Sequence, residues 1–346
     1  MGNYFVTDFM YSNKLKAEFP KAIHPQFGEI TAPLIISASR ATDIPAFYSD
    51  CLINRFEQGY AAKINPYDRS KISYLSLEKV KAIVFWSKNP EPLIDRLDYF
   101  NTREIAYYFQ FTLNDYEKEN LEPGLPKLNE RIETFQRLSE KIGKEKVIWR
   151  FDPLVKTDNT SYDDLLERIM KIADKIVPFT DKLVFSFAEI ESYRKVKRAL
   201  NSRKDIFSLT LDKYQATEEE KIFFAKKLSS LIPELKKLNP DFQIASCADS
   251  IDYSIYGIVP NRCIDDELLL KISDDAELQQ FLRPSLFRDE YYLKDRGQRK
   301  NCGCILSRDI GAYDSCPHFC LYCYANSSKE AILNKMSSFN NMSDYI

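Results

Sequence analysis

Six short apolar runs recur along the chain, and amphipathic helical patterns lie between most of them. Strands buried on both faces have this nearly continuous apolar character. A strand followed by a helix, repeated about six times, predicts a parallel sheet with helices outside it, either an open doubly wound sheet or a barrel. The predicted strands occupy residues 33–39, 82–87, 106–113, 147–152, 182–188 and 242–247.

Four amphipathic stretches carry helix-end signals, namely a capping residue or proline at the start, or glycine after the end. A further stretch, residues 61–75, alternates between polar and apolar positions and is expected to form a hairpin. The four helices are expected at residues 45–56, 132–142, 161–176 and 217–238.

One face of two predicted strands carries polar side chains. Gln110, Thr112 and Asn114 alternate with apolar neighbours, and Arg150 and Asp152 repeat the pattern on the next strand. Such a face is costly in a dry core but suits strands that surround a ligand-bearing lumen. We therefore predict an α/β fold, a complete or partial TIM-like (β/α) barrel of roughly six core parallel strands with a C-terminal cysteine-rich cluster loop.

Polar groups also end most of the predicted strands, where active sites of parallel barrels form. The alternative is that neighbours such as Arg40 and Asp43 are only local ion pairs and turn caps. The candidates for catalysis or substrate binding are Gln110, Thr112, Asn114, Arg150, Asp152 and Glu189, and those for cofactor binding include Arg40 and Lys88.

Three segments are expected along the chain. Residues 1–32 contain no strong pattern and are predicted to be an N-terminal extension, and residues 33–290 form the barrel. Residues 291–346 contain five of the eight cysteines, thiolates being the usual ligands of iron–sulfur clusters, and are expected to form a C-terminal cysteine-rich iron–sulfur segment that packs on the barrel mouth.

A cysteine triad, Cys316, Cys320 and Cys323, lies in one eight-residue run. Three thiolates supply three of the four ligands of a [4Fe–4S] cluster and leave one iron open. A structural zinc site is the alternative, since four thiolates also suit zinc. Zinc sites usually pair C-x2-C units, often with histidine, whereas this chain has only His24 and His318.

The other five cysteines give weaker indications of a metal site than the triad does. The glycine between Cys302 and Cys304 lets both thiols turn toward one centre. Together with Cys247 and Cys263, this pair could form a second four-sulfur site, for zinc or another cluster. Cys51 is expected to be a buried cysteine without a ligand role.

Composition excludes several classes of protein. With 49 basic and 51 acidic residues, the net charge of −2 lacks the basic footprint of a nucleic-acid binder. The apolar runs are too short to span a bilayer, and no glycine pattern fits a Rossmann or P-loop nucleotide site. The first residues do not resemble a secretion signal, so free thiols imply a cytoplasmic protein.

Two resemblances extend these expectations. Residues 33–326 resemble the family known as domain of unknown function 1848, through residues 35–45, 84–90, 109–113, 149–153 and 307–314. That family has no established reaction. The triad spacing and the aromatic Tyr322 resemble the cluster loop of radical S-adenosylmethionine (SAM) enzymes, although that loop follows the first barrel strand there and all six predicted strands here.

The resemblance implies a radical SAM-type enzyme. The triad would hold the cluster, SAM would bind the open iron, and Tyr322 would flank the nucleotide. An electron donor such as ferredoxin or flavodoxin and a small-molecule substrate would be its partners. The alternatives are a zinc or electron-transfer protein without SAM chemistry, and a metal-assisted hydrolase using Asp43, Asp152 and Glu189.

Overall fold

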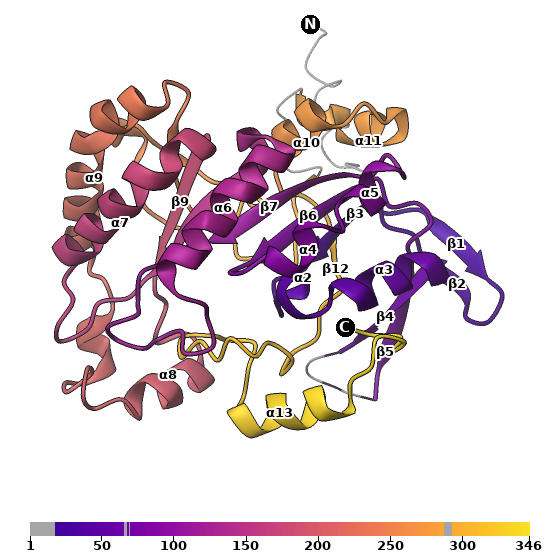
Figure 1. The fold of residues 1–346 in the computed structure, drawn as a ribbon, viewed down its shortest axis with the longest axis horizontal. Coiled ribbons are helices and arrows are strands. Elements are labelled where there is room, and N and C mark those ends of the chain that lie inside the picture. The colour runs from indigo at the N-terminus through magenta and orange to yellow at the C-terminus, as the bar shows by residue number, and fades with distance from the viewer. Residues whose placement is uncertain (1–17, 66–67, 69, 287–292) are drawn as a thin grey trace, which may run out of the picture.

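An eight-stranded parallel sheet forms the centre of the protein (Figure 1). The computed structural model describes residues 18–65, 68, 70–286 and 293–346. All six predicted strands are confirmed, and they lie side by side in chain order. They are β3 (Ile35–Ala38), β6 (Ala82–Ser87), β7 (Ala106–Thr112), β8 (Val147–Leu154), β9 (Lys182–Phe187) and β10 (Gln243–Ser246).

Two further strands complete the sheet at its edges. β11 (Ile258–Pro260) pairs with β10, and β12 (Arg308–Asp309) pairs with β3 at the opposite edge. The resulting order, β11-β10-β9-β8-β7-β6-β3-β12, follows the chain from β3 to β11 and places β12 beside β3. A complete barrel is therefore not formed among the described residues, because these two short edge strands do not pair with each other.

Helices pack on the outer face of the sheet. The helices expected at residues 161–176 and 217–238 both begin with a capping box, Ser161 with Asp164 and Thr217 with Glu220. The helix expected at residues 45–56 is interrupted at Tyr48, whose φ of −132° is not helical. The helices are α2 (Ile44–Phe47), α3 (Ser49–Gln58), α4 (Glu91–Ile94), α5 (Asp98–Asn101), α6 (Leu128–Ile142), α7 (Tyr162–Ile176) and α9 (Glu218–Leu238). A further helix, α8 (Arg194–Asn201), lies instead beyond the carboxyl ends of the strands (Figure 1).

The inner face of the sheet changes character along the strands. Near the amino ends it is apolar, with Val84, Tyr108 and Ile148 packed in one cluster with Leu269 and Leu278. These leucines belong to α10 (Asp266–Ile272) and α11 (Ala276–Leu286), which lie at the end of the molecule opposite the C-terminal segment (Figure 1). Two residues farther along each strand, the same face carries Trp86, Gln110 and Arg150. The polar layer therefore faces the carboxyl ends.

A second, four-stranded sheet flanks the first. The predicted hairpin is confirmed as the antiparallel pair β4 (Tyr60–Ile64) and β5 (Ile72–Ser76). The strands β1 (Lys21–His24) and β2 (Gly28–Thr31) extend it in the order β1-β2-β5-β4. Residues 18–32 of the expected N-terminal extension thus include two strands, and residues 1–17 lie outside the described part.

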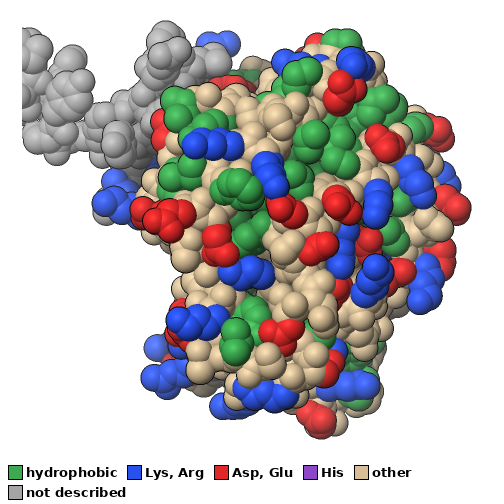
Figure 2. Space-filling view, turned by 90° about the vertical axis from the view of Figure 1, so that its left-hand side faces the viewer, with side chains coloured by type: hydrophobic (Ala, Val, Ile, Leu, Met, Phe, Trp, Pro, Cys, Tyr) green, Lys and Arg blue, Asp and Glu red, His purple; other side chains and the backbone are tan. Residues whose placement is uncertain are grey.

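The face over α7, α8 and α9 carries interspersed charges of both signs (Figure 2). This mixture agrees with the net charge of −2. Among the helices of the described residues, none has both the length and the apolar character that a membrane crossing requires.

The capping box of α7 provides a test of the fold. The Asp164 N–H donates to Ser161 Oγ at 3.2 Å, and the Asp164 carboxylate accepts from Ser161 N at 2.8 Å. Ser161→Ala should lower the free energy of unfolding by about 1 kcal/mol, measured by urea denaturation. Ser230→Ala, at an exposed position inside α9, is the control and should change it by less than about 0.5 kcal/mol. Equal effects of the two substitutions would contradict the role of the cap.

Candidate active site at the carboxyl ends of the strands

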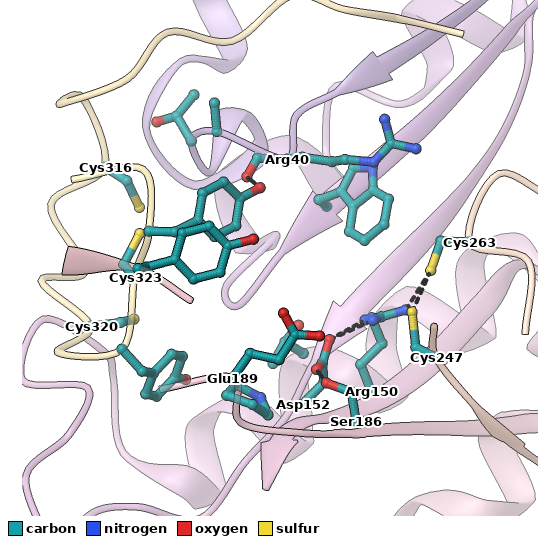
Figure 3. A pocket seen from close by; sticks show the side chains of 18 of the residues that line it. Arg40, Arg150, Asp152, Ser186, Glu189, Cys247, Cys263, Cys316, Cys320 and Cys323 are labelled. Carbon is teal, nitrogen blue, oxygen red and sulfur yellow. Dashed lines mark hydrogen bonds and ion pairs between the residues drawn. The ribbon is translucent and has the colours of Figure 1, made fainter. Parts of the chain in front are cut away.

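A cavity of about 620 Å³ lies at the carboxyl ends of the parallel strands. Residues at or just after the ends of β3, β6, β8, β9 and β10 line it, together with the C-terminal segment. Figure 3 shows the triad on one side and Cys247 and Cys263 across the cavity, with Arg150, Asp152 and Glu189 between them. All seven cysteines predicted as ligands line this cavity: Cys247, Cys263, Cys302, Cys304, Cys316, Cys320 and Cys323.

The triad loop is held by the loop that follows β7. The Leu321 N–H donates to the Leu121 carbonyl, and the Gly124 N–H donates to the His318 carbonyl, both at 2.9 Å. Asn326 Nδ2 donates to the Cys316 carbonyl at 3.0 Å. These backbone contacts fix the path of the loop, so its three thiols face the cavity.

The Asp43 carboxylate joins three chain segments beneath the triad. Its Oδ1 accepts from Ala46 N at 3.0 Å and from Ser87 Oγ at 2.7 Å. Its Oδ2 accepts from Lys88 N and lies 2.7 Å from His318 Nε2. Asp43 is 5% exposed and His318 is 1% exposed. Asp43 therefore caps α2 and also ties the triad loop to the ends of β3 and β6.

Asp309 on β12 makes a similar connection. Its Oδ1 accepts from Ser39 Oγ at 2.8 Å and from Gly311 N at 3.0 Å, and its Oδ2 accepts from Arg40 N at 2.8 Å. A Cβ at Gly311 would lie 2.0 Å from Ser39 Oγ. The segment leading into the triad therefore needs a glycine to approach the end of β3 this closely.

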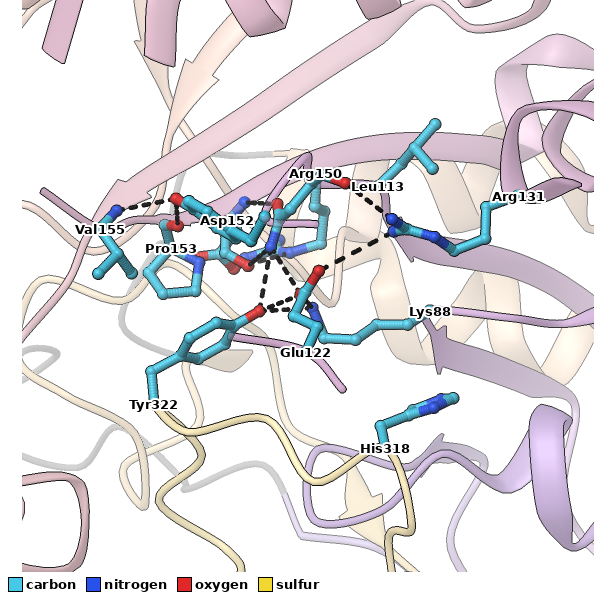
Figure 4. Close-up of polar contacts among 12 residues, drawn as sticks. Lys88, Leu113, Glu122, Arg131, Arg150, Asp152, Pro153, Val155, His318 and Tyr322 are labelled. Atoms are coloured by element: carbon cyan, nitrogen blue, oxygen red, sulfur yellow. Dashed lines mark hydrogen bonds and ion pairs between the residues drawn. The ribbon is translucent and has the colours of Figure 1, made fainter. Parts of the chain in front are cut away.

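A buried polar network lies behind Tyr322 (Figure 4). Glu122 accepts from Lys88 Nζ at 2.7 Å and from the Tyr322 hydroxyl, and Arg131 Nη1 lies 4.0 Å from its second oxygen. Asn114 Nδ2 donates to Glu122 at 3.1 Å. Burial would raise the pKa of Glu122, but Lys88 and Arg131 outweigh it and hold the pKa below its ordinary value of 4.5.

Arg150 and Asp152 form an ion pair on β8, beside Ser186 of β9. Arg150 Nε donates to Asp152 Oδ2 at 3.1 Å, and Ser186 Oγ donates to Asp152 Oδ1. Burial would raise the pKa of Asp152, but the Arg150 guanidinium outweighs it, so the pKa lies below its ordinary value. The carboxylate is therefore charged at neutral pH and held on the cavity wall.

The polar residues predicted for the site divide into two groups. Gln110 and Asn114 are buried supports that do not line the cavity: Gln110 accepts from Arg150 Nη1 at 3.1 Å, and Asn114 accepts from Asp152 N at 2.8 Å. Asp43, Asp152 and Glu189, the residues of the hydrolase alternative, already form hydrogen bonds or ion pairs within the protein, and Glu189 pairs with Arg299. Apart from the cysteines, the predicted residues that line the cavity are Arg40, Asp43, Lys88, Thr112, Arg150, Asp152, Glu189 and Tyr322.

Several aromatic residues of the cavity were not predicted. Tyr324 stacks on Tyr193 with ring centroids 5.4 Å apart and meets Tyr313 edge-on at 6.2 Å. Trp86 lies between Arg40 and Arg150, each guanidinium carbon 5.3 Å from the ring centroid. In the sequence, the position of Trp86 at the end of a predicted strand was the one indication that an aromatic residue would line the cavity. The tyrosines come from distant loops, which sequence periodicity does not relate.

Buried polar atoms on the cavity wall that lack hydrogen-bond partners among the described residues include the donors Trp86 Nε1 and Arg40 Nη2. Burying a donor without a hydrogen bond is costly. Both atoms are therefore suited to donate to acceptor groups of a bound ligand.

The positions of the thiols do not by themselves define a metal site. Within the residues that the structure describes, no three His, Cys, Asp or Glu side chains are gathered as they would be around a bound ion. Burial, then the nearby Asp43 carboxylate, raises the pKa of Cys316 to about 12. Cys51 lies away from the cavity, buried on α3, as expected.

Comparison with known families identifies the chain. It belongs to the family described as Domain of unknown function (DUF1848), whose family model matches residues 35–325. No curated protein and no solved structure matches it. The family assignment confirms the resemblance and brings no reaction with it.

Gly124 tests how the triad loop is positioned. An added Cβ would lie 2.3 Å from the Pro317 carbonyl oxygen and 2.8 Å from His318 Cα, which are backbone atoms. Gly124→Ala should therefore displace the loop, lower the free energy of unfolding by about 1–3 kcal/mol, and accelerate hydrogen exchange at residues 316–323.

Gly297→Ala is the control for this substitution, because the atom nearest to its added Cβ is the end of a side chain, Asp295 Oδ1, at 3.2 Å. Hydrogen exchange at residues 316–323 should match the wild type in this control. Wild-type exchange in Gly124→Ala as well would show that the contact does not position the loop.

Glu122 tests the buried network. Glu122→Gln should lower the free energy of unfolding by about 3 kcal/mol at pH 7, because Lys88 and Arg131 lose their buried counter-charge. Since the folded pKa of Glu122 is lowered, its stabilising effect is present above pH 4.5 and is lost as the pH falls further. Urea denaturation at pH 7 and at lower pH should show the two proteins converging.

The matched control is Glu91→Gln, which removes one partner of the exposed Glu91–Arg137 pair. It should cost less than about 1 kcal/mol at either pH. A constant difference between wild type and Glu122→Gln across the pH range would exclude a charge effect.

Proposed function

We propose that this member of the DUF1848 family is an iron–sulfur enzyme of radical SAM type. Cys316, Cys320 and Cys323 would hold a [4Fe–4S] cluster, and SAM would bind at its fourth iron. When bound, this pair supplies one-electron reductive cleavage of SAM, which starts radical chemistry on a substrate. The substrate would be a small molecule in the cavity.

One observation carries this proposal: the three triad thiols line the same cavity as the polar carboxyl ends of the parallel strands. A cluster-binding loop at the end of the chain thus lies where a parallel α/β sheet usually has its active site. A volume of about 620 Å³ is in the range of small-molecule and cofactor sites.

The residues present fit a cluster in their donor chemistry. Three thiols come from one anchored loop, and no fourth cysteine belongs to that loop. Burial raises the pKa of Cys320 well above its ordinary value, and the nearby Lys88 ammonium group opposes this shift. A thiolate-bound cluster carries negative charge, which this ammonium group would partly offset.

The remaining cavity residues would bind and orient SAM and substrate. Trp86 Nε1 and Arg40 Nη2 supply donors to acceptor groups such as a carboxylate. The ring of Tyr322 would flank the nucleotide, since its hydroxyl is held by Glu122. Asp152, Thr112 and Glu189 would contact the ligand from the strand ends, while Gln110 and Asn114 hold Arg150 and Asp152 in place.

Three further features complete the proposal. The sheet would serve as a partial barrel, open on the side where its edge strands stay apart. The enzyme would work in the cytoplasm, where thiols remain reduced. A ferredoxin or flavodoxin would deliver the electron.

The test is metal and product analysis of protein prepared without oxygen. Wild type should bind about four irons and four sulfides per chain, and Cys320→Ala should lose most of both. Cys51→Ala is the matched control and should load like wild type, because Cys51 is buried on α3 away from the cavity. Adding SAM and dithionite to loaded wild type should yield 5′-deoxyadenosine.

Two results would contradict the proposal. A fully loaded cluster that gives no 5′-deoxyadenosine would exclude radical SAM chemistry. Zinc in place of iron, lost in Cys320→Ala, would favour a structural metal site in the triad.

A further inference from the structure

Four cysteines lie across the cavity from the triad and are not used in the proposed function. Cys247 follows β10, Cys263 follows β11, and Cys302 and Cys304 precede β12. They are thus brought together at the opening between β11 and β12. Cys263, Cys302 and Cys304 are buried, and Cys247 is half-buried.

The four cysteine side chains lie next to one another. Cys247 Sγ lies 3.4 Å from Cys263 Sγ. The Cys304 thiol lies near enough to Cys263 and Cys302 to influence the pKa of each. The four side chains are therefore neighbours, although the segments that carry them meet only through folding.

Hydrogen-bond donors surround these sulfurs. Arg150 Nη1 and Asn261 Nδ2 each donate to Cys263 Sγ at 3.1 Å. The Ile264 N–H donates to Cys304 Sγ at 3.4 Å, and the Arg40 guanidinium lies beside Cys304. Neutral thiols are weak acceptors, whereas metal-bound thiolates are charged and are commonly hydrogen-bonded in this way.

The backbone at Cys263 is also fixed from the inner face of the sheet. Its carbonyl accepts from Tyr108 Oη at 2.8 Å and from Gln110 Nε2 at 2.9 Å. The same Gln110 accepts from Arg150 Nη1. One buried amide therefore orients both the ligand loop and the guanidinium that faces its sulfur.

We propose that Cys247, Cys263, Cys302 and Cys304 form a tetrahedral thiolate site for a single Zn²⁺ ion. Zn–S bonds of about 2.3 Å in a tetrahedron place the sulfurs about 3.8 Å apart. The distance between Cys247 Sγ and Cys263 Sγ, 3.4 Å, is close to this value. The thiolates of an iron–sulfur cluster bind different irons and lie farther apart. Four thiolates leave Zn²⁺ with two excess negative charges, which Arg40 and Arg150 offset.

The ion would close the open side of the sheet. Its ligands come from the β10 and β11 ends of one edge and from the segment entering β12 at the other. Between these edges the described backbone provides few links, such as Ile305 N to the Ile264 carbonyl at 3.2 Å. With all four positions filled by sulfur, the zinc is structural and leaves no site for substrate.

Elemental analysis of protein prepared without oxygen tests this site. Wild type should hold about one zinc per chain, and Cys304→Ala should hold at least about tenfold less. A variant with Cys316, Cys320 and Cys323 all replaced by Ala should keep its zinc, as should Cys51→Ala. Wild type loaded with Co²⁺ should show the absorption bands of tetrahedral cobalt bound by four thiolates. This measurement does not depend on the folding of any variant.

The site is independent of the proposed function, and the same samples separate the two. Zinc without iron would leave this site standing and contradict the cluster; iron without zinc would do the reverse. Absence of zinc from wild type, zinc that leaves with the triad, or cobalt bands of a different ligand set would overturn the proposal. So would a Cys247–Cys263 disulfide found by mass spectrometry in the oxygen-free protein.

Discussion

Two carboxylates, the buried Asp43 and the half-buried Asp309, hold the C-terminal segment against the ends of the strands, and the rest of the site depends on them. Asp43 accepts or shares four hydrogen bonds from α2, from the end of β6 and from His318 of the triad loop. Asp309 binds the turn after β3 in the same manner. Because a carboxylate withdrawn from water is costly unless it is hydrogen-bonded, the buried Asp43 fixes the separation of the segments that it joins most strongly, and the half-buried Asp309 adds to this.

These contacts explain how cysteines at the end of the chain reach the first strands. β12 pairs with β3, so the segment after it emerges beside the turn that carries Arg40 and Asp43. From there the triad loop packs on the loop after β7, through Gly124. The order of segments along the chain therefore does not limit which groups meet at the cavity, and the triad loop can follow the strands that it covers.

Sequence patterns predicted the parts of the fold that repeat locally. Six strands, the caps at Ser161 and Thr217 and the hairpin follow from periodicity and capping chemistry, which act over a few residues. β12 has two residues and β11 has three, too short for any pattern. The alternation of Gln110 and Asn114 correctly marked a polar face, but only tertiary packing shows that both are buried beneath the cavity, and that Glu122 supports Tyr322.

Charge balance links the two sulfur groups to the metals proposed for them. Burial raises the pKa of all three triad thiols, that of Cys316 to about 12, so they are protonated at neutral pH when no metal is bound. A metal centre there must release these protons as it forms. Across the cavity the pKa values of Cys247, Cys263 and Cys304 are also raised, so a metal would displace protons there too. On that side, Arg40 and Arg150 lie beside the sulfurs and would offset the negative charge of metal-bound thiolates.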